Sequence, residues 1–171
     1  AGRTDLNRAW LWAIVTFLYY FGGLAVILRV NPQLLNERGV WNKRKDTKKW
    51  DKVLLQIFGT VGLYFHTILM ALEARRFELT LLTPWYILPG MILYTGGFNL
   101  VYWAMAENTH FETTVRIQHD RNHRVISTGP YRIVRHPGYA GLILTNFGST
   151  MILGSMYGFI TAMATLVILG I

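Results

Sequence analysis

The sequence predicts an all-α polytopic membrane protein with about five transmembrane helices, the last two forming a tight helical hairpin. Hydrophobic residues make up 52% of the 171 residues and charged residues only 15%, whereas soluble domains average about 45–50% and about 25%. The remaining charges are grouped between long apolar runs, and a run of about 20 residues suffices to cross a bilayer. The sequence contains no cysteine, which excludes disulfides and thiolate chemistry.

The positive charge fits a membrane protein better than a nucleic-acid-binding protein. The formal net charge is +8, and a strongly basic surface favours nucleic acid in a soluble protein. Here the lysines and arginines lie in the loops between apolar runs, where basic loops stay in the cytosol and touch anionic lipid. We therefore expect membrane lipids as partners and no nucleic acid.

Residues 9–30 form the first predicted transmembrane helix. Trp10 and Trp12 fit an aromatic belt at the membrane interface. The run is too long for the apolar region of a signal peptide and lacks a small-residue cleavage site, so we interpret it as a retained anchor. Asn31 and Pro32 end this helix.

The loop that follows is basic and closes the first of two expected units, residues 1–52 and 53–171. We interpret it as a topology determinant; a platform for acidic headgroups or a cofactor is the alternative. Its cationic residues are Arg38, Lys43, Arg44, Lys45, Lys48, Lys49 and Lys52.

Two further spans are predicted at residues 53–72 and 86–106. The first contains His66, and a titratable residue at membrane depth is a functional candidate, although a neighbouring helix can also satisfy a neutral histidine. In the second, Gly96 and Gly97 thin the helix. Such thinning serves either close helix packing or room for a cofactor.

The polar stretch 107–128 is expected to hold two short strands, residues 115–118 and 124–126. A metal site is an alternative here, because the stretch contains three histidines, His110, His119 and His123. Because Asp120 and Asn122 favour a turn over a helix that would align the last two, we expect no metal.

Residues 139–171 contain no charged residue and are too long for one span, so a helical hairpin that breaks near Gly154 is expected. Loops 31–52 and 107–137 then lie on the same face of the membrane. Together they carry twelve lysines and arginines, and the positive-inside rule places them in the cytosol.

Residues 128–141, read Thr-Gly-Pro-Tyr-Arg-Ile-Val-Arg-His-Pro-Gly-Tyr-Ala-Gly, combine turn-forming, cationic and aromatic residues. Pro137 disfavours the helical conformation at His136, so the imidazole is presented from an extended link. Arg132, Arg135 and His136 offer donors for a carboxylate or phosphate. Tyr139 offers an aromatic face and Gly138 permits close approach of a ligand or helix.

This segment resembles the signature of the isoprenylcysteine carboxyl methyltransferase family, integral-membrane enzymes that use S-adenosylmethionine and have phospholipid methyltransferases as relatives. The resemblance implies a methyltransferase whose site lies in a cytosolic loop and whose acceptor is lipophilic. The acceptor could be a prenylcysteine-like carboxylate, a phospholipid amine or a small lipophilic molecule. Arg135 and Tyr131 are the expected catalytic residues, meeting the acceptor or bracing the loop. The expected cofactor-binding residues are Gly97, Gly129, Arg132, His136, Pro137, Gly138 and Tyr139.

Two other functions stay open. The family carries an Arg…Glu-Glu motif after the hairpin, which is expected beyond Ile171 unless the protein is an inactive relative or a non-catalytic scaffold. The arginines would also suit an NADPH-dependent membrane reductase of sterols or similar lipids, although such reductases more often have Asn where Pro137 stands.

Overall fold

The computed structural model describes residues 7–39, 49–73, 82–111 and 125–170, and all the regular structure in these ranges is helical. In chain order the elements are α1 (Asn7–Val30), α2 (Pro32–Gly39), α3 (Lys49–Phe58), the π-helical η2 (Gly59–Phe65), α4 (His66–Leu72), the short 3-10 helix η4 (Pro84–Tyr86), α5 (Ile87–Glu107), the 3-10 turn η6 (Gly129–Arg132), α6 (Pro137–Leu153) and α7 (Met156–Gly170).

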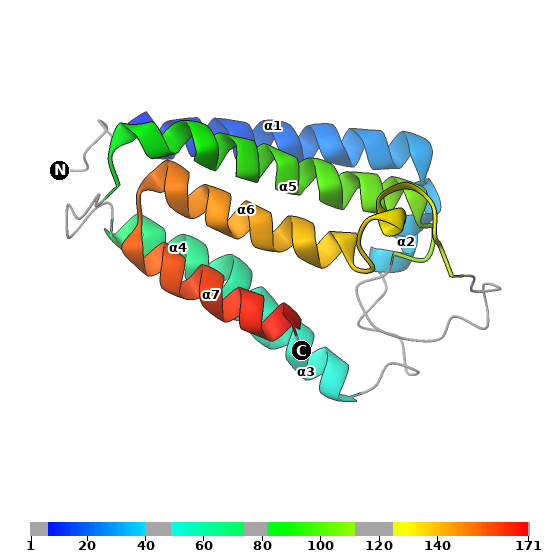
Figure 1. The fold of residues 1–171 in the computed structure, drawn as a ribbon. Helices are drawn as coiled ribbons and strands as arrows, with labels where there is room; N and C mark the ends of the chain where they lie inside the picture. Colours follow the sequence, from blue (N-terminus) through cyan, green and yellow to red (C-terminus); the bar gives the residue numbers. More distant parts are fainter. Residues whose placement is uncertain (1–6, 40–48, 74–81, 112–124, 171) are drawn as a thin grey trace.

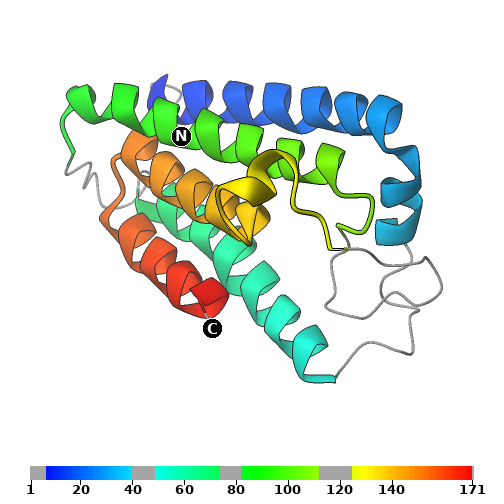
Figure 2. The ribbon, with the colours of Figure 1, turned by 45° about the vertical axis from the view of Figure 1, so that its right-hand side comes forward.

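The helices form one bundle in which α6 occupies the middle. Figures 1 and 2 show α1, α5 and α6 running side by side, with α4 and α7 on the other side of α6. The end of α5, η6, the start of α6 and the short α2 gather at one end of the bundle. The described parts of loops 31–52 and 107–137 therefore share one end, as predicted.

The predicted apolar runs are helical in the structure. Among the described helices, Asn7–Val30 is long and apolar enough by itself to cross a membrane, with a mean hydropathy of 2.0. The apolar helices Gln56–Leu72 and Met156–Leu169 are shorter. The all-helical class is thus confirmed, while the number of membrane spans stays a prediction.

The backbones of α5 and α6 touch at glycines. A Cβ atom on Gly97 would lie 2.6 Å from the carbonyl oxygen of Gly141, and one on Gly148 would lie 2.4 Å from the backbone nitrogen of Tyr94. Such approach is possible only where no side chain intervenes. Gly96, by contrast, has nothing within 4 Å of its Cβ position. The packing alternative for Gly97 is therefore the one that its surroundings support.

The predicted hairpin breaks at Gly154. Its φ of 71° is left-handed, a conformation that glycine adopts without strain. The N–H groups of Gly154 and Ser155 both donate to the carbonyl of Thr150, at 2.8 and 3.1 Å, and end α6. The next residues begin α7.

A buried carboxylate fastens this hairpin to the second helical run. Glu73 is 2% exposed and accepts hydrogen bonds from the Ser155 hydroxyl and from the backbone N–H groups of Met156 (2.9 Å) and Tyr157 (3.1 Å). These N–H groups have no partner within the first turn of α7, and a carboxylate complements the positive end of the helix dipole. Glu73 thus caps α7 from another element.

Two local predictions were wrong. Residues 32–39 form the helix α2 rather than a loop, because a proline is well suited to the first position of a helix. Residues 125–126 have no regular structure, and their predicted partner strand, residues 115–118, lies outside the described residues. His119 and His123 also lie outside them.

The glycine contact predicts a contrast between neighbouring positions. Gly97→Ala should lower the free energy of unfolding by about 1–3 kcal/mol, since its methyl group meets the backbone of α6. Gly96→Ala should leave stability unchanged or raise it by up to about 1 kcal/mol, since alanine favours the helix. Chemical denaturation in detergent measures both. Equal stability of the two variants would contradict the packing role of Gly97.

The Glu73 cap predicts a second stability effect. Glu73→Gln should cost about 1–2 kcal/mol in the free energy of unfolding, because the amide offers a single acceptor and no charge to the start of α7. Thr67→Ala is the control: its exposed hydroxyl donates to the carbonyl of Leu63, four residues earlier in the same helical run, so the change should stay within about 0.5 kcal/mol. A Glu73→Gln protein as stable as the control would refute the cap.

Candidate functional site

The Gly-Pro-Tyr turn docks on the C-terminal end of α5. Gly129 has a φ of +55°, and a Cβ atom there would lie 2.9 Å from the carboxyl carbon of Glu107. The Tyr131 hydroxyl accepts from Nδ2 of Asn108 at 3.1 Å and donates to the carbonyl of Ala104 at 3.4 Å. Burial raises the pKa of Tyr131, so the phenol stays protonated and keeps its donor role. These two bonds tie the loop to the end of α5, and the expected catalytic role of Tyr131 stays a prediction.

The second half of the motif starts α6. Pro137 stands in the first helical turn, and His136 before it has φ −125° and ψ 66°, outside the helical region, as predicted. The imidazole of His136 stacks on the ring of Tyr139, with 5.6 Å between centroids and 19° between planes. The side chains of Arg132, Arg135 and His136 are exposed on this loop. The structure thus brings donors and an aromatic face together at one helix start.

Gly138 is needed because Phe111 covers it. A Cβ atom on Gly138 would lie 2.5 Å from Cζ of the Phe111 ring. Both Pro137 and Gly138 are buried, so they hold the helix start in place while the residues around them face outward. Gly97 lies deeper in the bundle, at the contact of α5 with Gly141.

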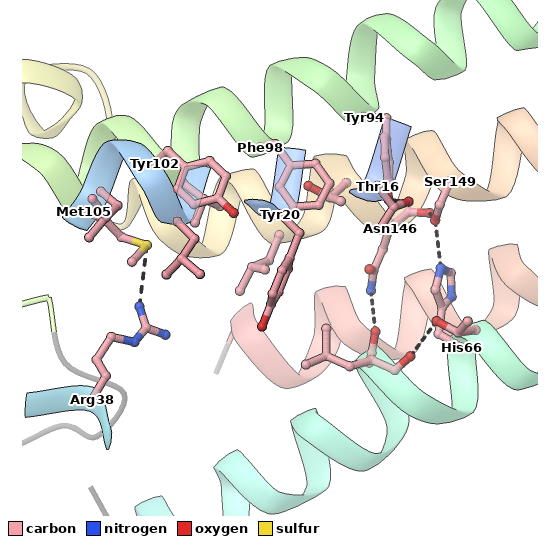
Figure 3. A pocket seen from close by; sticks show the side chains of 18 of the residues that line it. Thr16, Tyr20, Arg38, His66, Tyr94, Phe98, Tyr102, Met105, Asn146 and Ser149 are labelled. Atoms are coloured by element: carbon pink, nitrogen blue, oxygen red, sulfur yellow. Dashed lines mark hydrogen bonds between the residues drawn. The ribbon is translucent and has the colours of Figure 1, made fainter. Parts of the chain in front are cut away.

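A half-open cavity of about 540 Å³ lies between α1 and α5 on one side and η2, α4 and α6 on the other. Its volume is within the range of small-molecule sites. Figure 3 shows Arg38 and Met105 at one end, His66 and Ser149 at the other, and aromatic side chains between them. The lining side chains are mainly apolar and include Trp12, Tyr20, Leu24, Ile27, Leu63, Phe98, Val101, Tyr102, Phe111 and Leu142.

The inner end is a closed polar network. His66 is 3% exposed; its Nδ1 lies 2.6 Å from the Thr161 hydroxyl and its Nε2 lies 2.9 Å from the Ser149 hydroxyl. Asn146 donates to the carbonyl of Gly62 at 3.2 Å and to the Thr165 hydroxyl at 3.1 Å. Because both ring nitrogens of His66 are engaged, its role here is to join α4, α6 and α7.

The cation Arg38 lies at the outer end of the cavity, beside Met105 and Phe111. Nη1 of Arg38 lies 3.6 Å from the sulfur of Met105, and its guanidinium carbon lies 5.6 Å from the centroid of the Phe111 ring. Burial lowers the pKa of Arg38, yet a guanidinium stays charged in proteins. Asn31 holds this corner by donating to the carbonyl of Met105 at 3.0 Å.

Phe111 connects the cavity with the motif. Its ring lines the outer end of the cavity and covers Gly138 at the start of α6. The predicted residues of the loop, from Gly129 to Tyr139, do not themselves line the cavity. Phe111 was not predicted from the sequence. Arg38 was predicted only as one charge of a basic loop, either a topology determinant or a platform for acidic headgroups or a cofactor, because no local pattern sets it apart from its neighbours.

The described residues contain no group of three histidine or acidic side chains that could hold a metal ion. Of the histidines considered for a metal, His110 is described, and its backbone N–H donates to Oδ1 of Asn108 at 2.8 Å. The expectation of no metal stays a prediction for the whole stretch.

The bracing role of Tyr131 is testable by a double-mutant cycle with Asn108. Tyr131→Phe and Asn108→Ala should each reduce the free energy of unfolding by about 1 kcal/mol, and the double variant should lose less than the sum, because the two share one hydrogen bond. Tyr86→Phe, an exposed tyrosine in η4, is the control. Strict additivity in denaturation experiments would show that the Tyr131–Asn108 bond contributes nothing.

Comparison of the sequence with known proteins identifies the family of this chain. The family model described as "Phospholipid methyltransferase" matches residues 85–171, which include α5, η6, α6 and α7. Two rice proteins, from Oryza sativa subsp. indica and japonica, carry the name "Probable protein-S-isoprenylcysteine O-methyltransferase" and are each 37% identical over 43 residues, 25% of this chain. The match spans only 22% of their own length. No solved structure matches the chain significantly. The family match, which covers half of the chain, shows that this protein belongs to the phospholipid methyltransferase family.

Proposed function

We propose that the protein is an S-adenosylmethionine-dependent methyltransferase that acts on a lipophilic acceptor at the cytosolic face of a membrane. The observation that carries the proposal is the position of Phe111, which lines an apolar cavity and packs on Gly138 of the Arg-His-Pro-Gly-Tyr motif. A pocket for an apolar acceptor and a polar loop suited to a charged cofactor are thereby neighbours.

The loop offers what this cofactor needs. The guanidinium groups of Arg132 and Arg135 and the imidazole of His136 are exposed donors for its carboxylate. The stacked rings of His136 and Tyr139 offer faces that attract a sulfonium. Gly129, Pro137 and Gly138 shape the backbone around them. When bound, the cofactor supplies an electrophilic methyl group, so the protein has mainly to position the reactants and exclude water.

The cavity suits the acceptor. Aromatic and aliphatic side chains line most of it, so an apolar chain gains free energy by leaving water. Its outer end lies against Phe111, which directs an acceptor group toward the loop. Gly97 lets α6 approach α5, which supports a packing role, and a contact with the cofactor stays a prediction. Arg135, exposed next to His136, is proposed to meet the acceptor or to brace the loop.

The membrane location rests on the same helices. The side chains of α1 are largely exposed and apolar; they include Trp10, Ile14, Phe17, Leu18 and Phe21. Such a surface is stable when lipid covers it. Because the described parts of the two basic loops share the end that carries the motif, the positive-inside rule supports a cytosolic site, where the cofactor is made available.

Calorimetric titration of the protein in lipid nanodiscs tests the proposal. S-adenosylmethionine and its demethylated product should both bind, and His136→Ala should weaken both by about tenfold or more, since a hydrogen bond to a charged ligand is lost. Ile133→Ala, an exposed apolar position of the same loop, should bind like the unaltered protein.

The same titration separates the rival functions. Binding of NADPH in place of S-adenosylmethionine would assign the protein to the lipid reductases. If neither cofactor bound to the folded protein, a non-catalytic role such as a membrane scaffold would replace the enzyme.

A further inference from the structure

Arg38 is a cation that lines an otherwise uncharged cavity. The other residues around the cavity are apolar, aromatic or neutral polar residues, apart from His66, whose two ring nitrogens are already engaged at the far end. Within the described part of the chain, the guanidinium of Arg38 contacts a thioether sulfur and an aromatic ring, from Met105 and Phe111. No carboxylate of the described residues pairs with it.

These two contacts engage few of the donors of Arg38, which is half-buried. A thioether is a weak acceptor, and a guanidinium has five N–H donors in a planar fork. Charges away from water are stable when paired and hydrogen-bonded. The nearby carbonyl of Met105 already accepts from Asn31. The geometry therefore leaves donors of Arg38 available to a ligand in the cavity.

We infer that the cavity binds a lipophilic carboxylate with a single hydrocarbon chain, and that Arg38 selects its head group. The carboxylate meets the guanidinium fork beside Met105, and the chain runs between Tyr20 and Phe98 toward Ser149 (Figure 3). A single fixed cation matches a monoanion, and the fork matches the two oxygens of a carboxylate. The Ser149 hydroxyl at the inner end lies 2.9 Å from Nε2 of His66 and donates to the carbonyl of Asn146, so it requires no polar group from the end of the chain.

The sign of the charge excludes other head groups. A protonated amine would face the guanidinium at close range in an apolar cavity, where like charges repel strongly. A neutral ester or alcohol would leave the cation without a counter-ion. Arg38 is thus the specificity-determining residue among the lipophilic acceptors that the proposed methyltransferase could use. The inference rests on the proposed function only in treating the cavity as the acceptor site.

Photo-crosslinking tests the inference without any cofactor. The protein, in nanodiscs of phosphatidylcholine, is labelled by a diazirine derivative of palmitate, and unlabelled palmitate, methyl palmitate and hexadecylamine compete. Palmitate should compete at least about tenfold better than methyl palmitate or the amine, because only palmitate is paired by Arg38. Mass spectrometry should place the crosslinks on α1, α5 and α6. Equal competition by all three ligands would overturn the inference, and this comparison needs no variant.

Variants of Arg38 assign the effect to that side chain. Arg38→Gln should abolish the preference for palmitate over methyl palmitate, and Arg38→Lys should retain part of it, since the charge remains without the fork. Arg29→Gln, an exposed arginine near the end of α1, should keep the full preference. Loss of preference in Arg29→Gln, or its retention in Arg38→Gln, would remove Arg38 from the site.

The cofactor titration keeps this inference distinct from the proposed function. Arg38→Gln should bind S-adenosylmethionine and its product with unchanged affinity. If that variant lost cofactor binding and kept the palmitate preference, Arg38 would hold the cofactor carboxylate, and the inference would be wrong. If the unaltered protein bound palmitate selectively but no cofactor, the lipid site would stand and the methyltransferase proposal would fall.

Discussion

The contact between the backbones of α5 and α6 is the constraint on which the rest of the structure depends. Glycines at positions 90 and 97 of α5 face glycines at 148 and 141 of α6, each pair seven residues apart along its helix. Because a spacing of seven returns to nearly the same face of a helix, the two helices stay in contact over their length. The end of α5 is then fixed beside the start of α6, so the turn at Gly129 can dock on Glu107 and Phe111 can cover Gly138.

Hydrogen bonds within the apolar bundle add a second constraint. Polar groups in the interior form hydrogen bonds between helices. His66 of α4 bonds Ser149 of α6 and Thr161 of α7, and Glu73, just after α4, accepts from the start of α7. In an apolar environment an unpaired polar group is costly, so such pairs fix how the helices lie relative to one another. Against this background the sulfur and ring contacts of Arg38 stand out. At the inner end of the cavity, His66, Asn146 and Ser149 are hydrogen-bonded by the protein itself, whereas Arg38 at the outer end has no carboxylate partner among the described residues.

The helices and turns were largely predictable from the sequence, whereas the cavity was not. Long apolar runs mark α1 and α5, and Gly154 marks the hairpin break, because hydropathy and left-handed glycine are local properties. The helix after Pro32 was missed because its polar composition reads equally well as a loop. The motif from Gly129 to Tyr139 identified the loop, yet Phe111 carried no local signal: its importance arises from contacts with residues distant in sequence. The role of Gly97 was likewise not predictable from the sequence, because close approach of either a ligand or a helix would require a glycine there.

The site divides its tasks between helices and loop, and Phe111 is where they meet. The helices supply a largely apolar cavity, while the loop supplies exposed donors that suit a charged molecule. A transfer between two such ligands requires that both be held within a few ångströms, because small misplacements slow a positioned reaction severely. Phe111 contacts the cation of Arg38 on one side and Gly138 on the other. The distance between the outer end of the cavity and the loop is therefore set by the end of α5, which the glycine contact with α6 holds in place.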